Sequence, residues 1–152
     1  MIAIGCDHAG YLLKEEVRRF LEEQGVQYRD YGSYEGEPCD YPVVAQKVCN
    51  AIVSNQAQLG LLFCGTGVGI SMAANKVRGI RAACCENVYS AKYTRLHNDA
   101  NVLCMGGRVI GPGLACEMVG AFLNAEFEGG RHQRRVSQIM EIEAGKLLDP
   151  GC

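Results

Sequence analysis

The chain alternates between short apolar runs and longer segments in which apolar residues recur every three to four positions. The short runs predict buried strands, and the longer spacing predicts amphipathic helices. In chain order, the predicted strands span residues 1–5, 26–31, 59–64, 79–85 and 100–105. The predicted helices span residues 11–24, 40–54, 71–76, 87–97, 111–123 and 131–146. Strands therefore alternate with helices along almost the whole chain.

This alternation predicts an α/β fold, a sandwich with a five-stranded parallel sheet and right-handed crossovers. Strands made of unbroken apolar runs are typical of a sheet that helices cover on both faces. A chain of 152 residues suits a single domain, residues 1–152. Ligands of such folds bind at the carboxyl ends of the strands. Three segments at that edge therefore merit attention: Cys6-Asp7-His8, the loop after Cys64, and the segment after the fifth strand.

Several local signals define how the predicted helices begin and end. Gly25 is a plausible stop for the first helix, and Asp40 and Pro42 suit the cap and the first turn of the second. Residues 128–130 predict a hinge before the last, charged helix. The residues after that helix are expected to be loosely ordered.

Composition excludes several classes of function. The chain is 48% hydrophobic and 21% charged, with a formal net charge of -2, so its overall charge predicts neither nucleic-acid nor membrane binding. No apolar run is long enough to span a bilayer. The strand-like N-terminus lacks a basic region, which predicts no signal peptide and a cytoplasmic location. None of the nine cysteines forms a C-x-x-C pair, so most are expected to be reduced thiols in the core.

The loop after the third predicted strand carries the strongest chemical signal. The apolar run ends at Cys64, and glycines follow at positions 65, 67 and 69 before a helix. Alternating glycines bring backbone N–H groups close to a ligand, and a helix N-terminus favours a thiolate. The loop lacks the G-x-G-x-x-G and Walker patterns, and Ile70 occupies the position of the arginine in the C-x5-R motif of tyrosine phosphatases. Two interpretations of the loop remain. Its amides form a ring that holds an oxyanion, or the loop is only a tight structural turn.

Two other polar segments each allow a functional and a structural reading. Asp7 and His8 suit contacts with substrate hydroxyls or phosphate, or else Asp7 caps a helix beside a surface histidine. Residues 97–99, His-Asn-Asp, suit a site or the C-terminal cap of the fourth helix.

The densest basic cluster of the chain is residues 131–135. Arg131 and Arg135 lie four positions apart, so they share one face of a helix and match a phosphate well. A solvated helix start is the alternative. Arg108, after two glycines, is a third candidate for a phosphate contact.

Four segments of the chain resemble the sugar-phosphate isomerases of the ribose-5-phosphate isomerase B type. They read G-C-D-H-A-G-Y at residues 5–11, C-G-T-G-V-G-I-S-M-A-A-N-K at 64–76, R-L-H-N-D-A-N-V-L at 95–103 and E-G-G-R-H-Q-R-R-V at 128–136. Galactose-6-phosphate and allose-6-phosphate isomerases belong to the same superfamily. The resemblance covers about residues 1–143 and all four motifs in order.

The resemblance implies an aldose–ketose isomerase that interconverts ribose 5-phosphate and ribulose 5-phosphate through an enediolate, without metal or cofactor. It also implies a Rossmann-like three-layer α/β/α sandwich. The protein would be a homodimer or a dimer of dimers whose active sites take residues from both subunits, with the helix at 131–146 packing on the partner. Two alternatives stay open: an isomerase of a six-carbon aldose phosphate, and a non-catalytic phosphosugar-binding module.

The resemblance also implies roles for individual residues. Cys64 would be the base that moves a proton between C1 and C2 of the sugar, and Thr66 and His97 would assist ring opening, with His97 as the proton donor. The substrate-binding positions would be Asp7, His8, Gly65, Thr66, Gly67, Val68, Gly69, Asn98, Arg108, Arg131 and Arg135. One branch of the family uses a glutamate at the position of Ile70 instead of the cysteine, so this chain resembles the cysteine-base branch.

Overall fold

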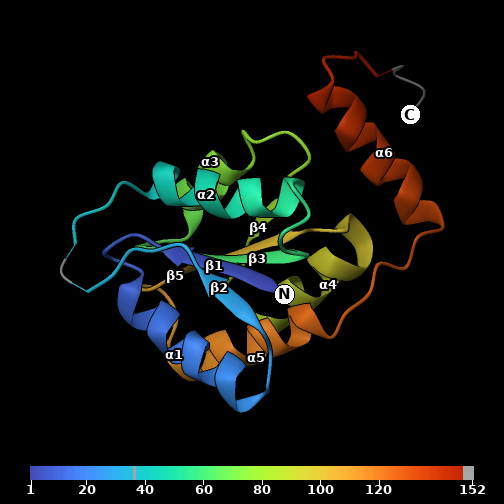
Figure 1. Ribbon diagram of the computed structural model, residues 1–152. Helices are drawn as coiled ribbons and strands as arrows, with labels where there is room; N and C mark the ends of the chain where they lie inside the picture. Colours follow the sequence, from blue (N-terminus) through green and yellow to red (C-terminus); the bar gives the residue numbers. More distant parts are fainter. Residues whose placement is uncertain (36, 149–152) are drawn as a thin grey trace.

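The computed structural model describes residues 1–35 and 37–148, which form a parallel sheet with helices on both faces (Figure 1). The strands are β1 (Ile2–Cys6), β2 (Tyr28–Asp30), β3 (Leu59–Cys64), β4 (Ala82–Cys84) and β5 (Val102–Gly106). The helices are α1 (Tyr11–Glu23), α2 (Tyr41–Val53), α3 (Val68–Ala74), α4 (Val88–Asn98), α5 (Pro112–Leu123) and α6 (Arg131–Glu143). The prediction of loose order for the chain end falls largely on residues 149–152, outside the described residues.

The five strands form one sheet in the order β2-β1-β3-β5-β4, and every neighbouring pair is parallel. In the register, Ile2 lies opposite both Tyr28 and Leu59, and Cys64 lies opposite Gly106. Helices α1 and α5 cover one face, and α2 and α3 cover the other (Figure 1). The predicted three-layer α/β/α fold with a five-stranded parallel sheet is therefore confirmed.

The sheet divides the apolar core into two clusters, because successive side chains of a strand point to opposite faces. On β3, Leu61 and Phe63 belong to the cluster under α1 and α5, whereas Leu62 and Cys64 belong to the cluster under α2 and α3. All four side chains are at most 4% exposed, which explains why β3 reads as an unbroken apolar run. The same alternation directs Cys64 toward the side of the sheet that carries α3.

Two predicted strands are shorter in the structure than in the sequence pattern. β2 covers only Tyr28–Asp30 of the predicted 26–31, and β4 covers only Ala82–Cys84 of the predicted 79–85. Both lie at the edges of the sheet, where a strand has one neighbour instead of two. Fewer partners for hydrogen bonds shorten the regular part of an edge strand.

Glycines and caps set the ends of the helices, in part differently from the predictions. Helix α3 begins at Val68, three residues before the predicted start, because Gly67 takes a left-handed φ of 80° and serves as its N-cap. Helix α6 ends at Glu143 rather than 146, shortly before Gly145 with φ 78°. Gly25, with φ 67°, follows α1 as predicted. Asp40 is the N-cap of α2 and Pro42 lies in its first turn, as predicted, although the Asp40 side chain makes no capping hydrogen bond.

Helix α6 extends away from the sheet and lies beside α4 (Figure 1). Gly129 and Gly130, both with positive φ, lie in the segment before it where a hinge is predicted. Ile139 and Ile142 on α6 are 44% and 59% exposed, and they line a cavity of about 450 Å³. No helix among the described residues has the length and apolar character needed to cross a membrane.

Candidate active site

Cys64 is the last residue of β3, and its side chain is held at the start of α3. The backbone N–H of Gly67 donates a hydrogen bond to Cys64 Sγ across 3.1 Å. Gly67 is the N-cap of α3, so the sulfur also meets the positive end of that short helix. The start of α3 therefore presents a hydrogen-bond donor to this sulfur.

Position 67 requires glycine for two separate reasons. Its φ of 80° is costly for any residue with a side chain. A Cβ at this position would also lie 2.9 Å from both Cys84 Sγ and the carbonyl carbon of Met105. The loop consequently packs directly on β4 and β5, and this contact fixes the N–H that faces the sulfur.

Two amides of the glycine loop already donate to groups of the loop itself. The N–H of Gly67 faces Cys64 Sγ, and the N–H of Val68 donates to Thr66 Oγ1 across 3.3 Å. The Thr66 residue is exposed, so this hydroxyl is accessible from solvent. An oxyanion held by the loop would have to share these donors or use the neighbouring amides.

A cavity of about 400 Å³ opens at the carboxyl edge of the sheet beside Cys64. The residues around it come from the segments after β1, β2, β3 and β5, as the position of ligand sites in parallel sheets predicts. The cavity is lined by Asp7, His8, Ala9, Cys39, Asp40, Tyr41, Cys64, Gly65, Thr66, Gly69 and Arg108. The structure therefore brings together most of the residues predicted near Cys64.

Asp7 lies in the turn that precedes α1. Its Oδ1 accepts hydrogen bonds from the N–H groups of Ala9 (2.9 Å) and Gly10 (3.0 Å). The N-cap of α1 is Gly10, so Asp7 holds this turn rather than capping the helix. The residue is only 6% exposed, yet it also lines the cavity. His8 is exposed at the cavity wall, and Arg108 is fixed through its backbone N–H, which donates to Gly65 O across 3.0 Å.

Sequence reasoning missed Cys39, Asp40 and Tyr41, which also line the cavity. The ring of Tyr41 packs against Gly69 so closely that a Cβ there would lie 2.9 Å from Tyr41 Cζ. No motif marks these residues. The only clue was the order of strands and helices. In a parallel sheet, the loop after β2 lies at the same edge as the loops after β1, β3 and β5.

The remaining buried cysteines differ from Cys64 in their surroundings. Burial raises the pKa of Cys49 to about 12 and that of Cys85 to about 11. Burial also raises the pKa of Cys6 to about 12, although the nearby Lys14 ammonium opposes this shift. These side chains therefore remain thiols at neutral pH and act as apolar core residues.

A second group of predicted site residues lies around α4. A cavity of about 340 Å³ is lined by His97 and Asn98 together with Cys84, Tyr89 and Tyr93. It adjoins the glycine loop, because Cys84 Sγ lies 3.8 Å from the Thr66 carbonyl oxygen. His97 and Asn98 do not line the cavity that contains Cys64.

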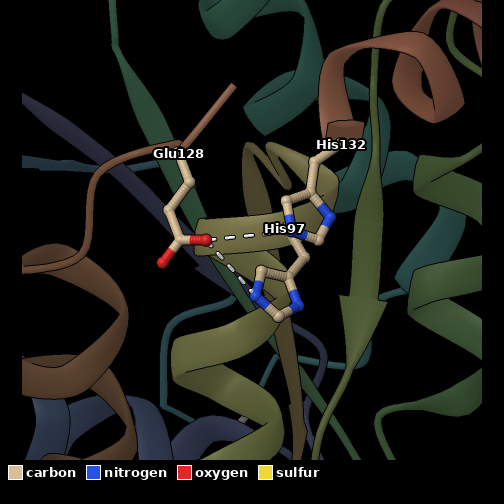
Figure 2. A group of neighbouring side chains, drawn as sticks. All are labelled: His97, Glu128 and His132. Atoms are coloured by element: carbon tan, nitrogen blue, oxygen red, sulfur yellow. Dashed lines mark ion pairs between the residues drawn. The ribbon is translucent and has the colours of Figure 1, made fainter. Parts of the chain in front are cut away.

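Aromatic rings continue from α4 onto α6. The rings of Tyr89 and Tyr93 stack at 4.2 Å, Tyr93 meets His97 edge-on at 4.9 Å, and His97 stacks on His132 at 4.0 Å. Glu128 Oε2 lies 3.5 Å from His97 Nε2 and 3.8 Å from His132 Nε2 (Figure 2). Burial, His97 and Arg131 lower the pKa of His132, which favours a neutral imidazole.

Arg131 and Arg135 are exposed in the first turns of α6. Arg131 Nε donates to His132 Nε2 across 3.5 Å, which places this guanidinium beside the histidine pair. Neither arginine lines the cavity that contains Cys64. Within one chain, the predicted site residues thus fall into two groups, one around Cys64 and one around His97.

Comparison with known proteins places these motifs in a family. Residues 2–139 match the family described as Ribose/Galactose Isomerase. Ribose-5-phosphate isomerase B of Escherichia coli is 51% identical over 142 residues, which are 93% of this chain and 95% of that protein. D-erythrulose-4-phosphate isomerase of Pectobacterium atrosepticum is 48% identical over 140 residues, 91% of each chain.

A solved structure agrees with the sequence comparisons. Ribose-5-phosphate isomerase B of Clostridium thermocellum superposes with a TM-score of 0.93 at 51% identity, covering 95% of this chain and 97% of that one. The glycine loop, the sheet order and the four motifs thus occur together in a chain that belongs to the ribose/galactose isomerase family.

Proposed function

We propose that this protein interconverts ribose 5-phosphate and ribulose 5-phosphate through an enediolate, with Cys64 as the base and without a catalytic metal. The observation that carries the proposal is the Cys64 sulfur, which accepts the Gly67 N–H at the start of α3 and lines a cavity of suitable size. The membership of the chain in a sugar isomerase family, and the name of its Escherichia coli relative, support the same reaction.

In the proposed reaction, the Cys64 thiolate removes the proton from C2 of the open-chain aldose. The C–H electron pair forms the C1=C2 bond of the enediolate, and the carbonyl electrons move to O1. The C2 hydroxyl proton passes to O1, which becomes the C1 hydroxyl group. The electrons left on O2 then form the C2 carbonyl while C1 takes the proton back from the thiol, and this gives the ketose. Backbone amides at residues 65–69 would stabilise the oxyanion, and by analogy with other oxyanion sites each is worth roughly 2.7–4 kcal/mol.

Ring opening precedes this step, because the sugar phosphate is cyclic in water. We assign the proton transfer of ring opening to Thr66 and His97, with His97 as the donor and Asn98 as a sugar contact. Phosphate would be bound by Arg108, Arg131 and Arg135, with His8 nearby. Binding of the remote phosphate holds the reacting carbons beside the sulfur, which lowers the entropic part of the barrier.

The two groups of site residues lead us to propose that a second copy of the chain completes each site. His97, Arg131 and Arg135 do not line the Cys64 cavity of their own chain. The exposed Ile139 and Ile142 give α6 an apolar surface suited to packing on the partner, as proposed for the last helix. In a homodimer, or in a dimer of dimers, the residues around His97 of one subunit would lie beside the Cys64 cavity of the other.

The direct test is conversion of ribose 5-phosphate by the purified protein in heavy water with a chelator present. We expect ribulose 5-phosphate to form and deuterium to enter at the exchanging carbon, because the thiol exchanges its proton with solvent. Cys64→Ala should lose most of kcat with little change in substrate binding. Cys116→Ala, a half-buried cysteine on α5, is the matched control and should keep normal turnover. Normal turnover by Cys64→Ala would remove Cys64 from the role of base.

A second candidate is an isomerase that acts on aldose phosphates of another length. The observation that favours it is the 48% identity to an enzyme named for a four-carbon sugar phosphate, in a family named for ribose and galactose. The six-carbon substrates allose 6-phosphate and galactose 6-phosphate are candidates for the same reason. A panel of kcat/KM values for four-, five- and six-carbon substrates decides between them. Binding without isotope exchange for every sugar would instead indicate a non-catalytic binding module.

A reducing compartment suits this proposal. A reactive thiol at Cys64, in a chain with nine cysteines, stays functional where cellular reductants prevent disulfide formation. We therefore propose that the protein works in the cytoplasm.

A further inference from the structure

Three side chains with ligand atoms meet where α4, the connecting segment and α6 come together (Figure 2). His97 is in the last turn of α4, Glu128 precedes the Gly129-Gly130 turn, and His132 is in the first turn of α6. The backbone N–H of Glu128 donates to Leu96 O across 3.0 Å, which fastens the connecting segment to α4. The backbone therefore holds all three side chains on one side of this junction.

The spacing of the three ligand atoms does not suit hydrogen bonds. Glu128 Oε2 is 3.5 Å from His97 Nε2 and 3.8 Å from His132 Nε2, whereas an N–H···O hydrogen bond spans about 2.7–3.2 Å. Two ligands on one tetrahedral zinc ion, at bond lengths of about 2.0–2.1 Å, lie roughly 3.3 Å apart. The ligand atoms of all three residues lie within 4.8 Å of one another. The carboxylate is thus spaced from both nitrogens much as it would be across a shared ion.

We propose that His97, Glu128 and His132 bind one divalent transition-metal ion, with Zn²⁺ as the best match, and that the bound ion inhibits the enzyme. Two imidazoles and one carboxylate are a known ligand set for zinc, with a fourth position left for water. Imidazole nitrogens disfavour Mg²⁺ and Ca²⁺, which prefer sites made of oxygen ligands.

Two local rearrangements accompany binding. The imidazole planes are 7° apart with centroids at 4.0 Å, and lone pairs that lie in parallel planes do not converge, so one ring must turn about its Cβ–Cγ bond to reach a shared ion. Arg131 Nε points at His132 Nε2, the atom that would bind the metal. Arg131 is exposed, so its side chain can move into solvent. Removal of this guanidinium should consequently tighten metal binding.

Inhibition follows from the role of His97, and this part of the inference rests on the proposed function. An ion on His97 Nε2 occupies the lone pair that would otherwise carry the proton for ring opening. The metal would therefore act as a reversible inhibitor rather than as a cofactor. Binding of the ion itself does not depend on which sugar the enzyme uses.

The test is calorimetric titration of the full-length, reduced and chelator-treated protein with Zn²⁺, repeated with Co²⁺ for its spectrum. We expect one ion per chain, visible bands typical of tetrahedral Co²⁺, and no thiolate charge-transfer band. Glu128→Gln and His132→Asn should each weaken binding at least roughly 10-fold, since even changes to outer-shell partners cost that much. Glu126→Gln removes a carboxylate from an exposed residue two positions earlier, so it is the matched control and should bind as the wild type does. Arg131→Ala should bind more tightly.

Equal Zn²⁺ affinity in the wild type, Glu128→Gln and His132→Asn would overturn the proposal, as would a charge-transfer band from a cysteine ligand. Circular dichroism shows whether either variant has lost its fold. If one has, the Zn²⁺ affinity of the other variant tests the proposal. In activity assays, Zn²⁺ should inhibit the wild type and EDTA should restore it, whereas Glu128→Gln should resist inhibition. A protein that binds Zn²⁺ at these residues but converts no sugar phosphate would refute the proposed function and its inhibition while keeping the metal site.

Discussion

Replacing Gly67 by alanine tests the geometry that holds the proposed base. The φ of 80° costs a residue with a Cβ roughly 1–2 kcal/mol. The added Cβ would lie 2.9 Å from Cys84 Sγ and the Met105 carbonyl carbon, and such overpacking typically costs about 1–3 kcal/mol. The sum is roughly 2–5 kcal/mol of unfolding free energy, or a fall in Tm of about 4–20 °C for a chain of this size.

Two matched variants separate the contributions to this cost. Gly79 has a similar φ of 86°, but a Cβ there would meet only Val53 Cγ1 at an ordinary 3.7 Å. Gly79→Ala should therefore lose only the backbone part, roughly 1–2 kcal/mol. Gly106 has no positive φ, yet its Cβ would lie 2.6 Å from the carbonyl carbon of Thr66, so Gly106→Ala reports the steric part.

The assay is thermal unfolding at one fixed protein concentration, followed by turnover of ribose 5-phosphate at a temperature where every variant is folded. We expect Gly67→Ala to melt below Gly79→Ala and to lose much more of kcat, because the N–H that faces Cys64 Sγ moves. Equal melting temperatures would refute the steric argument. Normal kcat in a destabilised Gly67→Ala would show that the N–H contact with sulfur is not needed for catalysis.

Three further predictions concern stability and phosphate binding. Lys14 is fully buried and pairs with Asp30, so Lys14→Met should lower the unfolding free energy by about 3 kcal/mol in urea titrations, and an unchanged midpoint would contradict this. Burial raises the pKa of Cys49 to about 12 in the folded protein, from 9.0 in the unfolded chain. The stabilisation of the folded state that comes from this thiol is therefore complete below pH 9 and is lost as the pH rises above it. In urea titrations from pH 8 to 10.5, the unfolding free energy of Cys49→Ala should fall less steeply with pH than that of the wild type. An identical slope would show that Cys49 does not cause the pH dependence. Arg135→Ala should raise KM for phosphorylated sugars at least several-fold in steady-state kinetics, with Arg134→Ala as its exposed neighbour and control; equal KM values would mean that the predicted phosphate contact is absent.

The central strands were predictable because burial on both faces of the sheet requires apolar residues at successive positions of a strand. β1, β3 and β5 are flanked by strands on each side and covered by helices, so each reads as an unbroken apolar run. The edge strands β2 and β4 were predicted too long, because a strand with one neighbour keeps only a short regular part. The early start of α3 depends on the left-handed φ of Gly67, and a glycine in a sequence does not reveal which φ it takes.

The candidate site was predictable only in part, for a different reason. Glycines and a cysteine at the end of a strand mark the loop after Cys64, and the strand-end rule places Asp7, His8 and Arg108 with it. Tyr41 lacks a motif, because it contributes a ring surface rather than a reactive group. The separation of His97 from the Cys64 cavity depends on how α4 packs against α5 and α6, which residue spacing along the chain does not encode.

The burial of Cys64 has a consequence for the chemistry that the protein survives. Its side chain is 4% exposed, accepts the Gly67 N–H at the start of α3 and lines the cavity at the edge of the sheet. A small oxidant such as hydrogen peroxide can enter that space and convert a thiolate to a sulfenic acid. A tripeptide disulfide such as oxidised glutathione needs an in-line approach to sulfur, which so small an exposed surface disfavours. The burial that shields the proposed base from bulky reagents would also delay its rescue by bulky reductants, so we expect activity to be sensitive to peroxide yet slow to recover.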